Sequence, residues 1–116
     1  MSSFIKSVFE EPCKHTVIKM PNPMDMSLLK DFQASIDETF EDSCFHVVFD
    51  FDGCDSILSA HLGILYQRYQ VAKQKGGAFY IIHGSQLIEQ AFARIGFNKL
   101  IKFCLDLEDV KDELPG

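Results

Sequence analysis

The side chains with the clearest chemical potential lie in one stretch of the chain. Asp50 and Asp52 close an apolar run, and Ser59 stands four residues before Gly63, near the start of a helical pattern. A serine hydroxyl at a helix start can accept a backbone N–H bond. Ser59 is therefore a candidate cap for this helix.

The elements that position these side chains follow from the hydrophobic pattern. Runs of apolar and β-branched residues predict five strands, and apolar residues at helical spacing predict four helices between and after them. The predicted strands span Phe4–Phe9, Thr16–Met20, Phe45–Phe51, Ala78–Ile82 and Leu100–Cys104. The first two should form a hairpin, and the later β and α elements alternate. We therefore expect an α/β fold with a mixed sheet, mostly parallel after the hairpin, and helices packed largely on one side.

The predicted helices each begin at a capping residue or close to one. The first starts at Asp25 or Ser27, the second near Ser59, the third at Ser85 and a short last one at Asp106. The apolar positions assigned to the second and third helices are Leu62, Leu65, Tyr66, Tyr69 and Ala72, and Leu87, Ile88, Ala91, Phe92 and Ile95.

Composition limits the classes of function. The net charge of −6, without a cluster of Lys or Arg, argues against nucleic-acid binding. No apolar run is long enough to span a membrane, and no signal peptide is recognisable, so we expect a cytoplasmic chain without membrane insertion. The four cysteines lack metal-ligand spacing and are expected to be reduced thiols, with no metal or cofactor. Residues 1–116 are expected to form one domain, as a monomer or weak dimer.

The stretch from Val47 to Ser56 resembles the nucleophile loop of haloacid-dehalogenase-like phosphatases. In that family the first Asp of D-x-D attacks phosphorus, the second acts as acid and base, and Mg²⁺ binds beside them. The resemblance would assign these roles to Asp50 and Asp52. However, no later predicted strand ends in the two carboxylates needed to complete the Mg²⁺ site, and Cys54 stands where that family usually has Thr. This is the enzymatic alternative.

A second resemblance covers nearly the whole chain. The segment Asp50–Gly53 resembles the D-L-S-G strand end of STAS domains, the family named for sulphate transporters and anti-sigma-factor antagonists. The segment Leu58–Gly63 is similar to the family's D-S-[ST]-G-L-G helix opening. Three later segments follow in family order: Gly76-Gly77 before a strand, the turn Ile95–Leu100 and the short helix Leu107–Val110. The chain is therefore identified as similar to a single STAS domain.

The resemblance assigns the family's phospho-acceptor to Ser59. That serine lies nine residues after the strand-end Asp and four before the second Gly of the motif, and both counts lead to Ser59. The pair Asp55-Ser56 fails both counts and is interpreted as a loop with a local side-chain-to-backbone hydrogen bond. The sequence departs from the motif at Leu58, Ala60 and His61, which replace Asp, Ser or Thr, and Gly. His61 is expected to be a solvated surface side chain.

The implied function is binding of a protein partner rather than catalysis. In the family, a kinase-type anti-sigma factor binds its antagonist and releases it after phosphorylating the serine, and a phosphatase restores binding. The expected contact residues are Asp52, Gly53, Leu58, Ser59, Ala60, His61 and Gly63. The altered motif leaves open an alternative within the family: a structural subunit of a transport or signalling complex that binds constitutively.

Overall fold

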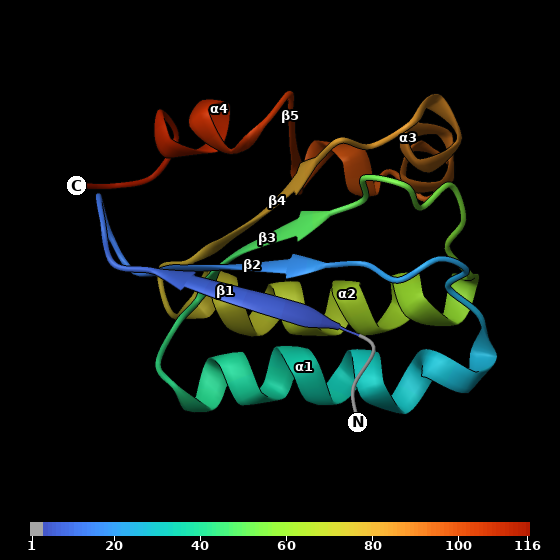
Figure 1. Cartoon of the computed structure of the whole chain (residues 1–116), viewed down its shortest axis with the longest axis horizontal. Coiled ribbons are helices and arrows are strands. Elements are labelled where there is room, and N and C mark those ends of the chain that lie inside the picture. Colours follow the sequence, from blue (N-terminus) through green and yellow to red (C-terminus); the bar gives the residue numbers. More distant parts are fainter. Residues whose placement is uncertain (1–3) are drawn as a thin grey trace.

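The computed structural model describes residues 4–116, which contain five strands, four α-helices and two short 3-10 helices (Figure 1). In chain order these are β1 (Ile5–Phe9), β2 (His15–Lys19), η1 (Met26–Leu28), α1 (Leu29–Glu41), β3 (His46–Asp50), α2 (Ser59–Gln74), β4 (Ala78–Ile82), α3 (Gln86–Ala93), η2 (Phe97–Lys99), β5 (Lys102–Cys104) and α4 (Leu107–Lys111). Every predicted strand and helix is present, with bounds that differ by a few residues.

The sheet has the strand order β1-β2-β3-β4-β5. β1 runs antiparallel to β2, and each later neighbouring pair is parallel. The predicted mixed sheet with an N-terminal hairpin is therefore confirmed. Because β2 to β5 are parallel, their carboxyl ends meet at one edge of the sheet, and the loop after β3 leaves the sheet there.

The two faces of the sheet are covered differently. Figure 1 shows α1 and α2 side by side beneath the sheet and α4 above it. The larger core lies against α1, α2 and α3, where Phe49 and Phe79 from the sheet meet Phe32, Leu65 and Phe92. The smaller core lies under α4, where Val110 and Leu114 cover Val48, Tyr80 and Ile82. Three of the four α-helices thus pack on one side, as predicted.

Side-chain caps hold the starts of three helical segments at the predicted residues. An Asp25 carboxylate oxygen accepts the Ser27 N–H at 3.0 Å, and the Ser85 hydroxyl accepts the Ile88 N–H at 3.3 Å. Asp106 accepts the Asp109 N–H at 2.9 Å. Each cap satisfies a backbone donor that the first helical turn leaves free, so the local sequence determines where these segments begin.

Three apolar residues predicted to face the core are instead exposed. Tyr66 is 47% exposed, Leu87 61% and Ile95 58%. On α3 the buried face is set by Ile88 and Phe92, four residues apart, and Ile95 lies beyond the end of that helix. A single sequence does not distinguish an apolar residue used in the core from one left on the surface.

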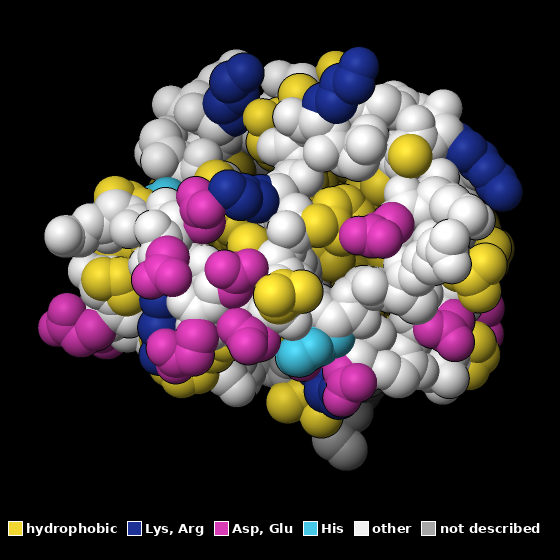
Figure 2. All heavy atoms as spheres, turned by 90° about the horizontal axis from the view of Figure 1, so that it is seen from above, with side chains coloured by type: hydrophobic (Ala, Val, Ile, Leu, Met, Phe, Trp, Pro, Cys, Tyr) yellow, Lys and Arg dark blue, Asp and Glu magenta, His cyan; other side chains and the backbone are white. Residues whose placement is uncertain are grey.

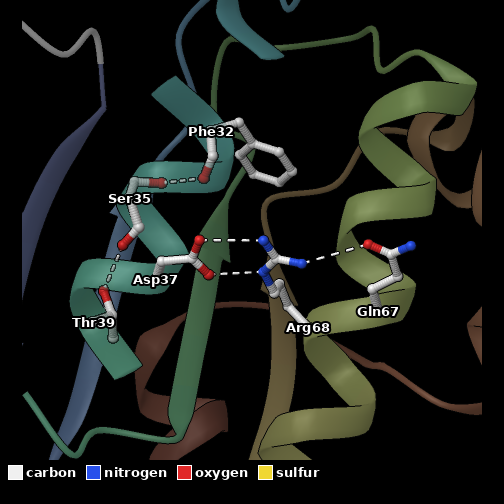
Figure 3. A network of polar contacts seen from close by, with 6 residues as sticks. All are labelled: Phe32, Ser35, Asp37, Thr39, Gln67 and Arg68. Atoms are coloured by element: carbon white, nitrogen blue, oxygen red, sulfur yellow. Dashed lines mark hydrogen bonds and ion pairs between the residues drawn. The ribbon is translucent and has the colours of Figure 1, made fainter. Parts of the chain in front are cut away.

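The helices α1 and α2 are linked by a bidentate ion pair between Asp37 and Arg68. Arg68 Nε donates to Asp37 Oδ1 at 2.7 Å, and Arg68 Nη2 donates to Asp37 Oδ2 at 3.2 Å (Figure 3). Arg68 Nη1 also reaches Gln67 Oε1 at 3.4 Å. The fork geometry matches a carboxylate and fixes the register of the two helices. Because the Asp37 side chain is partly exposed, water screens the pair and its contribution to stability is modest.

The turn between α2 and β4 depends on Gly77. A Cβ atom added there would lie 2.0 Å from the carbonyl oxygen of Phe45, closer than any side chain can approach. The same carbonyl accepts the Ala78 N–H at 3.1 Å, which starts the β3–β4 pairing. Glycine at this position therefore lets α2 end directly against the beginning of β3.

Leu65→Ala is expected to lower the free energy of unfolding by about 2–5 kcal/mol, because Leu65 is fully buried beneath the sheet and its loss leaves a cavity. Leu87→Ala is the matched control, since Leu87 is exposed on α3, and it should cost less than about 0.5 kcal/mol. Urea unfolding followed by circular dichroism measures both. Equal costs would contradict the assignment of the core face.

Candidate functional site

The loop after β3 is anchored at two points and exposed between them. Phe51 and Cys54 are buried, whereas Asp52 and Gly53 are exposed. An Asp50 carboxylate oxygen accepts the Asp52 N–H at 2.9 Å, which turns the chain at the end of the strand. The two carboxylates proposed for phosphoryl transfer thus lie at the same sheet edge, and the first has a structural task in the turn.

The side-chain-to-backbone hydrogen bond predicted at Asp55-Ser56 is not found, and a hydrogen bond from Cys54 holds this part of the loop instead. Cys54 Sγ donates to the Ser56 carbonyl at 3.3 Å, and within residues 4–116 neither the Asp55 nor the Ser56 side chain is found in a hydrogen bond. Burial raises the pKa of the Cys54 thiol, so it stays protonated and able to donate at neutral pH. The buried cysteine therefore holds the loop in shape.

Ser59 is the first residue of α2 and is exposed to solvent. The N-cap is Leu58, whose backbone is extended with φ −92° and ψ 158°. Ser59 thus lies near the N-cap, as predicted, but its hydroxyl does not cap α2, since no Ser59 side-chain hydrogen bond is found among the described residues. Its hydroxyl is left free at the positive end of the helix, next to the partly buried Ala60 and the exposed Gly63.

His61 caps the helix in place of the serine. The His61 side chain is fully buried, so the expectation of a solvated histidine is wrong and its ring is not presented to a partner. Its Nδ1 accepts the Leu58 N–H at 3.2 Å, in the position that Glu or Gln occupies in a capping box. The ring edge also meets the Phe32 ring of α1, with centroids 5.7 Å apart. His61 therefore ties the start of α2, and with it Ser59, to the core.

The environment of His61 favours the neutral ring. Burial lowers the His61 pKa, and the backbone carbonyl and carboxylate of Asp25 act in the opposite direction without offsetting it. Because Nδ1 accepts a hydrogen bond, the single proton of the neutral ring is on Nε2, which is buried and has no well-formed hydrogen bond. A second proton would turn the Nδ1 acceptor into a donor and remove the cap.

An apolar hollow lies beside Ser59. It has a volume of about 380 Å³ and is lined by Ser59, Leu62, Gly63, Tyr66 and Ile95, which we call the Ser59 groove. Leu58 is exposed next to it at the start of α2. Sequence reasoning assigned Tyr66 and Ile95 to the core and so missed this surface. Only the fold brings Ile95, which follows α3, against the first turns of α2.

Within residues 4–116, no three or more His, Cys, Asp or Glu side chains are placed to hold a metal ion. None of the described helices combines the length and apolar character needed to cross a membrane.

The STAS-domain family model matches residues 6–110, and the chain therefore belongs to the STAS domain family. Comparison with curated protein sequences finds no match. Membership in this family supports a role in binding other proteins.

Several solved structures share the fold. The protein TM1081 of Thermotoga maritima has a TM-score of 0.83 at 13% identity, over 97% of this chain and 89% of that one. An anti-sigma factor antagonist from Mycobacterium paratuberculosis has a TM-score of 0.78 at 19% identity, over 97% of both chains. The unphosphorylated anti-sigma factor antagonist SpoIIAA of Bacillus has a TM-score of 0.77 at 12% identity, over 97% of this chain and all of that one. SpoIIAA is also known in its phosphorylated form.

His61→Gln should make the start of α2 less sensitive to acid. The His61 pKa is lower in the folded chain than the value of about 6.5 expected on unfolding. The unfolded chain therefore gains a proton first as the pH falls below about 6.5, and stability declines from there down to the folded pKa. Gln keeps the acceptor for the Leu58 N–H but does not titrate in this range.

Hydrogen exchange of the Leu58 amide between pH 7.5 and 5, corrected for intrinsic rates, measures this effect. Wild-type protection should fall with pH, and His61→Gln protection should stay constant. His46→Gln is the control, because burial and His15 also lower the His46 pKa but His46 lies on β3, away from the cap. Equal loss of Leu58 protection in wild type and His61→Gln would rule out His61 as the acid-sensitive cap.

Proposed function

We propose that this chain is a non-catalytic interaction module of the anti-sigma-factor-antagonist kind. It binds a kinase-type anti-sigma factor through the start of α2, and phosphorylation of Ser59 switches the interaction. The observation that carries the proposal is the free, exposed hydroxyl of Ser59 at the first position of α2, on the rim of an apolar groove.

The proposed contact surface combines the loop after β3 with the Ser59 groove. The exposed residues Asp52, Gly53, Leu58 and Gly63 were expected from sequence, and the partly buried Ala60 lies among them. Tyr66 and Ile95 add exposed apolar area of the kind that marks protein-binding sites. His61 acts from beneath as a positioning residue, because its ring is buried and holds the Leu58 backbone.

A phosphate on Ser59 would leave the fold intact but weaken binding of the partner. At the first position of α2 the helix dipole favours negative charge, so the free protein tolerates the modification. In a docked complex the same charge would lie over Leu62, Tyr66 and Ile95, which offer no partner for it. An unpaired charge removed from water costs several kcal/mol, which is enough to release a partner.

The chain offers a specific reason to consider constitutive binding as a second candidate. Leu58 stands where the family motif has Asp, and its side chain is exposed beside Ser59. An apolar residue at this point enlarges the apolar surface and removes a feature available to a kinase. A structural subunit that binds through the same groove without phosphorylation would use these residues equally well.

Ser59→Glu should leave the fold unchanged and weaken binding of the partner about a hundredfold, because an unpaired carboxylate would be buried on docking. Immobilised wild-type chain captures the partner from lysate of the source cells, and calorimetry with the purified partner then gives the affinities. Ser59→Ala should bind like wild type. Gln70→Glu is the matched control, since it adds one charge at an exposed position on α2 outside the groove.

The outcomes separate the candidates. Full affinity of folded Ser59→Glu would remove Ser59 from the interface and contradict the proposed switch. Equal weakening by Gln70→Glu would attribute the effect to net charge rather than to the groove. Circular dichroism of each variant establishes that the fold is intact.

Leu58→Asp should raise phosphate incorporation at Ser59, because it restores the acidic residue that the family motif places before the acceptor. Lysate supplied with ATP and labelled phosphate, followed by mass spectrometry, measures this incorporation. Ser59→Ala should abolish the signal. Incorporation at Ser56 rather than Ser59 would show that the register derived from the motif is wrong, and no incorporation in any variant would favour constitutive binding.

A further inference from the structure

A second groove is lined by residues of α3, β5 and α4. Two hollows of about 470 and 270 Å³ share Glu89 and Phe103 in their walls, so they lie side by side. We call it the β5 groove and define it by Gly84, Glu89, Phe103, Leu105 and Asp109. It has no lining residue in common with the Ser59 groove, so it is a separate surface.

The floor of the β5 groove is apolar and fixed in place. Phe103 packs edge-on against Phe92 of the core, with ring centroids 5.4 Å apart. Gly84 leaves the Phe103 ring uncovered, since a Cβ atom there would lie 3.3 Å from Phe103 Cε2. Leu105 is 82% exposed at the rim, and its N–H is held by Asp109 Oδ2 at 3.1 Å. An apolar side chain this exposed, beside an apolar floor, is typical of a docking surface.

The walls of the groove are acidic. Glu89 of α3 stands on one side and Asp109 of α4 on the other. The other polar lining residues are His83, Gln86, Gln90 and Asn98, and the lining includes no Lys or Arg. Figure 2, viewed from above, shows acidic side chains gathered over the α4 side of this face and apolar side chains in a recess near its centre. Burial raises the pKa of the Cys104 thiol, and the carboxylates of Asp109 and Glu113 raise it further, against a smaller opposing effect of Lys102.

The sheet has two outer strands, β1 and β5, and β5 lies beside this groove. Among the described residues β5 pairs on one side only, with β4. An edge strand of this kind can accept an extended segment of another chain through its free backbone groups. Acidic walls select for positive charge, and the apolar floor selects for an aliphatic or aromatic side chain.

We propose that the β5 groove binds an extended segment of a partner protein in which an apolar side chain is flanked by Lys or Arg. The apolar side chain lies on Phe103 and Leu105, and the cations lie near Glu89 and Asp109. This surface does not depend on Ser59 or its phosphorylation, so a chain engaged through α2 keeps it available for a second protein.

A blocked pentapeptide of sequence lysine–leucine–lysine–valine–lysine provides the probe, with the glutamate counterpart as control. Titration into the isotope-labelled chain, followed by amide chemical shifts, should move the signals of Gly84, Phe103 and Leu105. The lysine peptide should bind more weakly as salt increases, because its cations face carboxylates. The glutamate peptide should cause no saturable shifts.

Two matched pairs of variants test the assignment. Glu89→Gln should weaken the lysine peptide about threefold or more, whereas Glu108→Gln, an exposed acid of α4 outside the groove, should not. Leu105→Lys should abolish binding, whereas Leu87→Lys, exposed on α3 but not lining the groove, should leave most of it.

Four results would overturn the proposal. Shifts confined to α4, or equal weakening by Glu108→Gln, would mean that general acidity attracts the peptide. Shifts centred on the Ser59 groove would assign the peptide to that surface. Absence of saturable shifts would show that the groove does not bind this chemistry.

Discussion

The burial of β3 is the constraint on which the other features depend. Val47, Val48 and Phe49 are all fully buried, because the strand is paired on both edges and covered on both faces. Successive side chains of a strand point to opposite faces, so this strand needs two cores, one under α4 and one against the other helices. The strand ends at Asp50, whose carboxylate accepts the Asp52 N–H and so turns the backbone away from the sheet. The start of α2, and therefore the serine, is delivered to the carboxyl edge of the sheet.

The start of α2 and the loop before it are held in place by side chains that the family motif does not specify. The serine is exposed and makes no cap, and the loop before it is held by two buried side chains, Phe51 and Cys54. His61 supplies the remaining tie by accepting the Leu58 N–H from inside the core. A residue that departs from the family motif thus takes over the task of fixing the helix start. Comparison with the motif alone treats His61 as a departure from the family pattern, whereas the structure shows that its side chain positions the start of α2.

The exposed apolar residues explain why the surface of this domain is suited to binding. Tyr66 and Ile95 flank the serine, and Leu105 projects beside the last strand. Leaving such side chains in water costs free energy that a partner can recover by covering them. The two grooves differ in character, since one is apolar around a hydroxyl and the other is apolar between carboxylates. They would therefore select different partners, and they have no lining residue in common.

The sequence by itself determined the order of elements, the hairpin, the parallel sheet and three capped helix starts. These depend on short-range patterns: β-branched runs, helical spacing and capping residues. The count from Asp50 to Gly63 also predicts Ser59 as the phospho-acceptor. Tertiary structure alone decided that His61 is buried, that Leu58 takes the cap position, and that Tyr66, Leu87 and Ile95 are exposed. The physical reason is that periodicity shows which residues share a helical face. Which part of that face is covered depends on chain segments far away in sequence, as Ile95 and the start of α2 demonstrate.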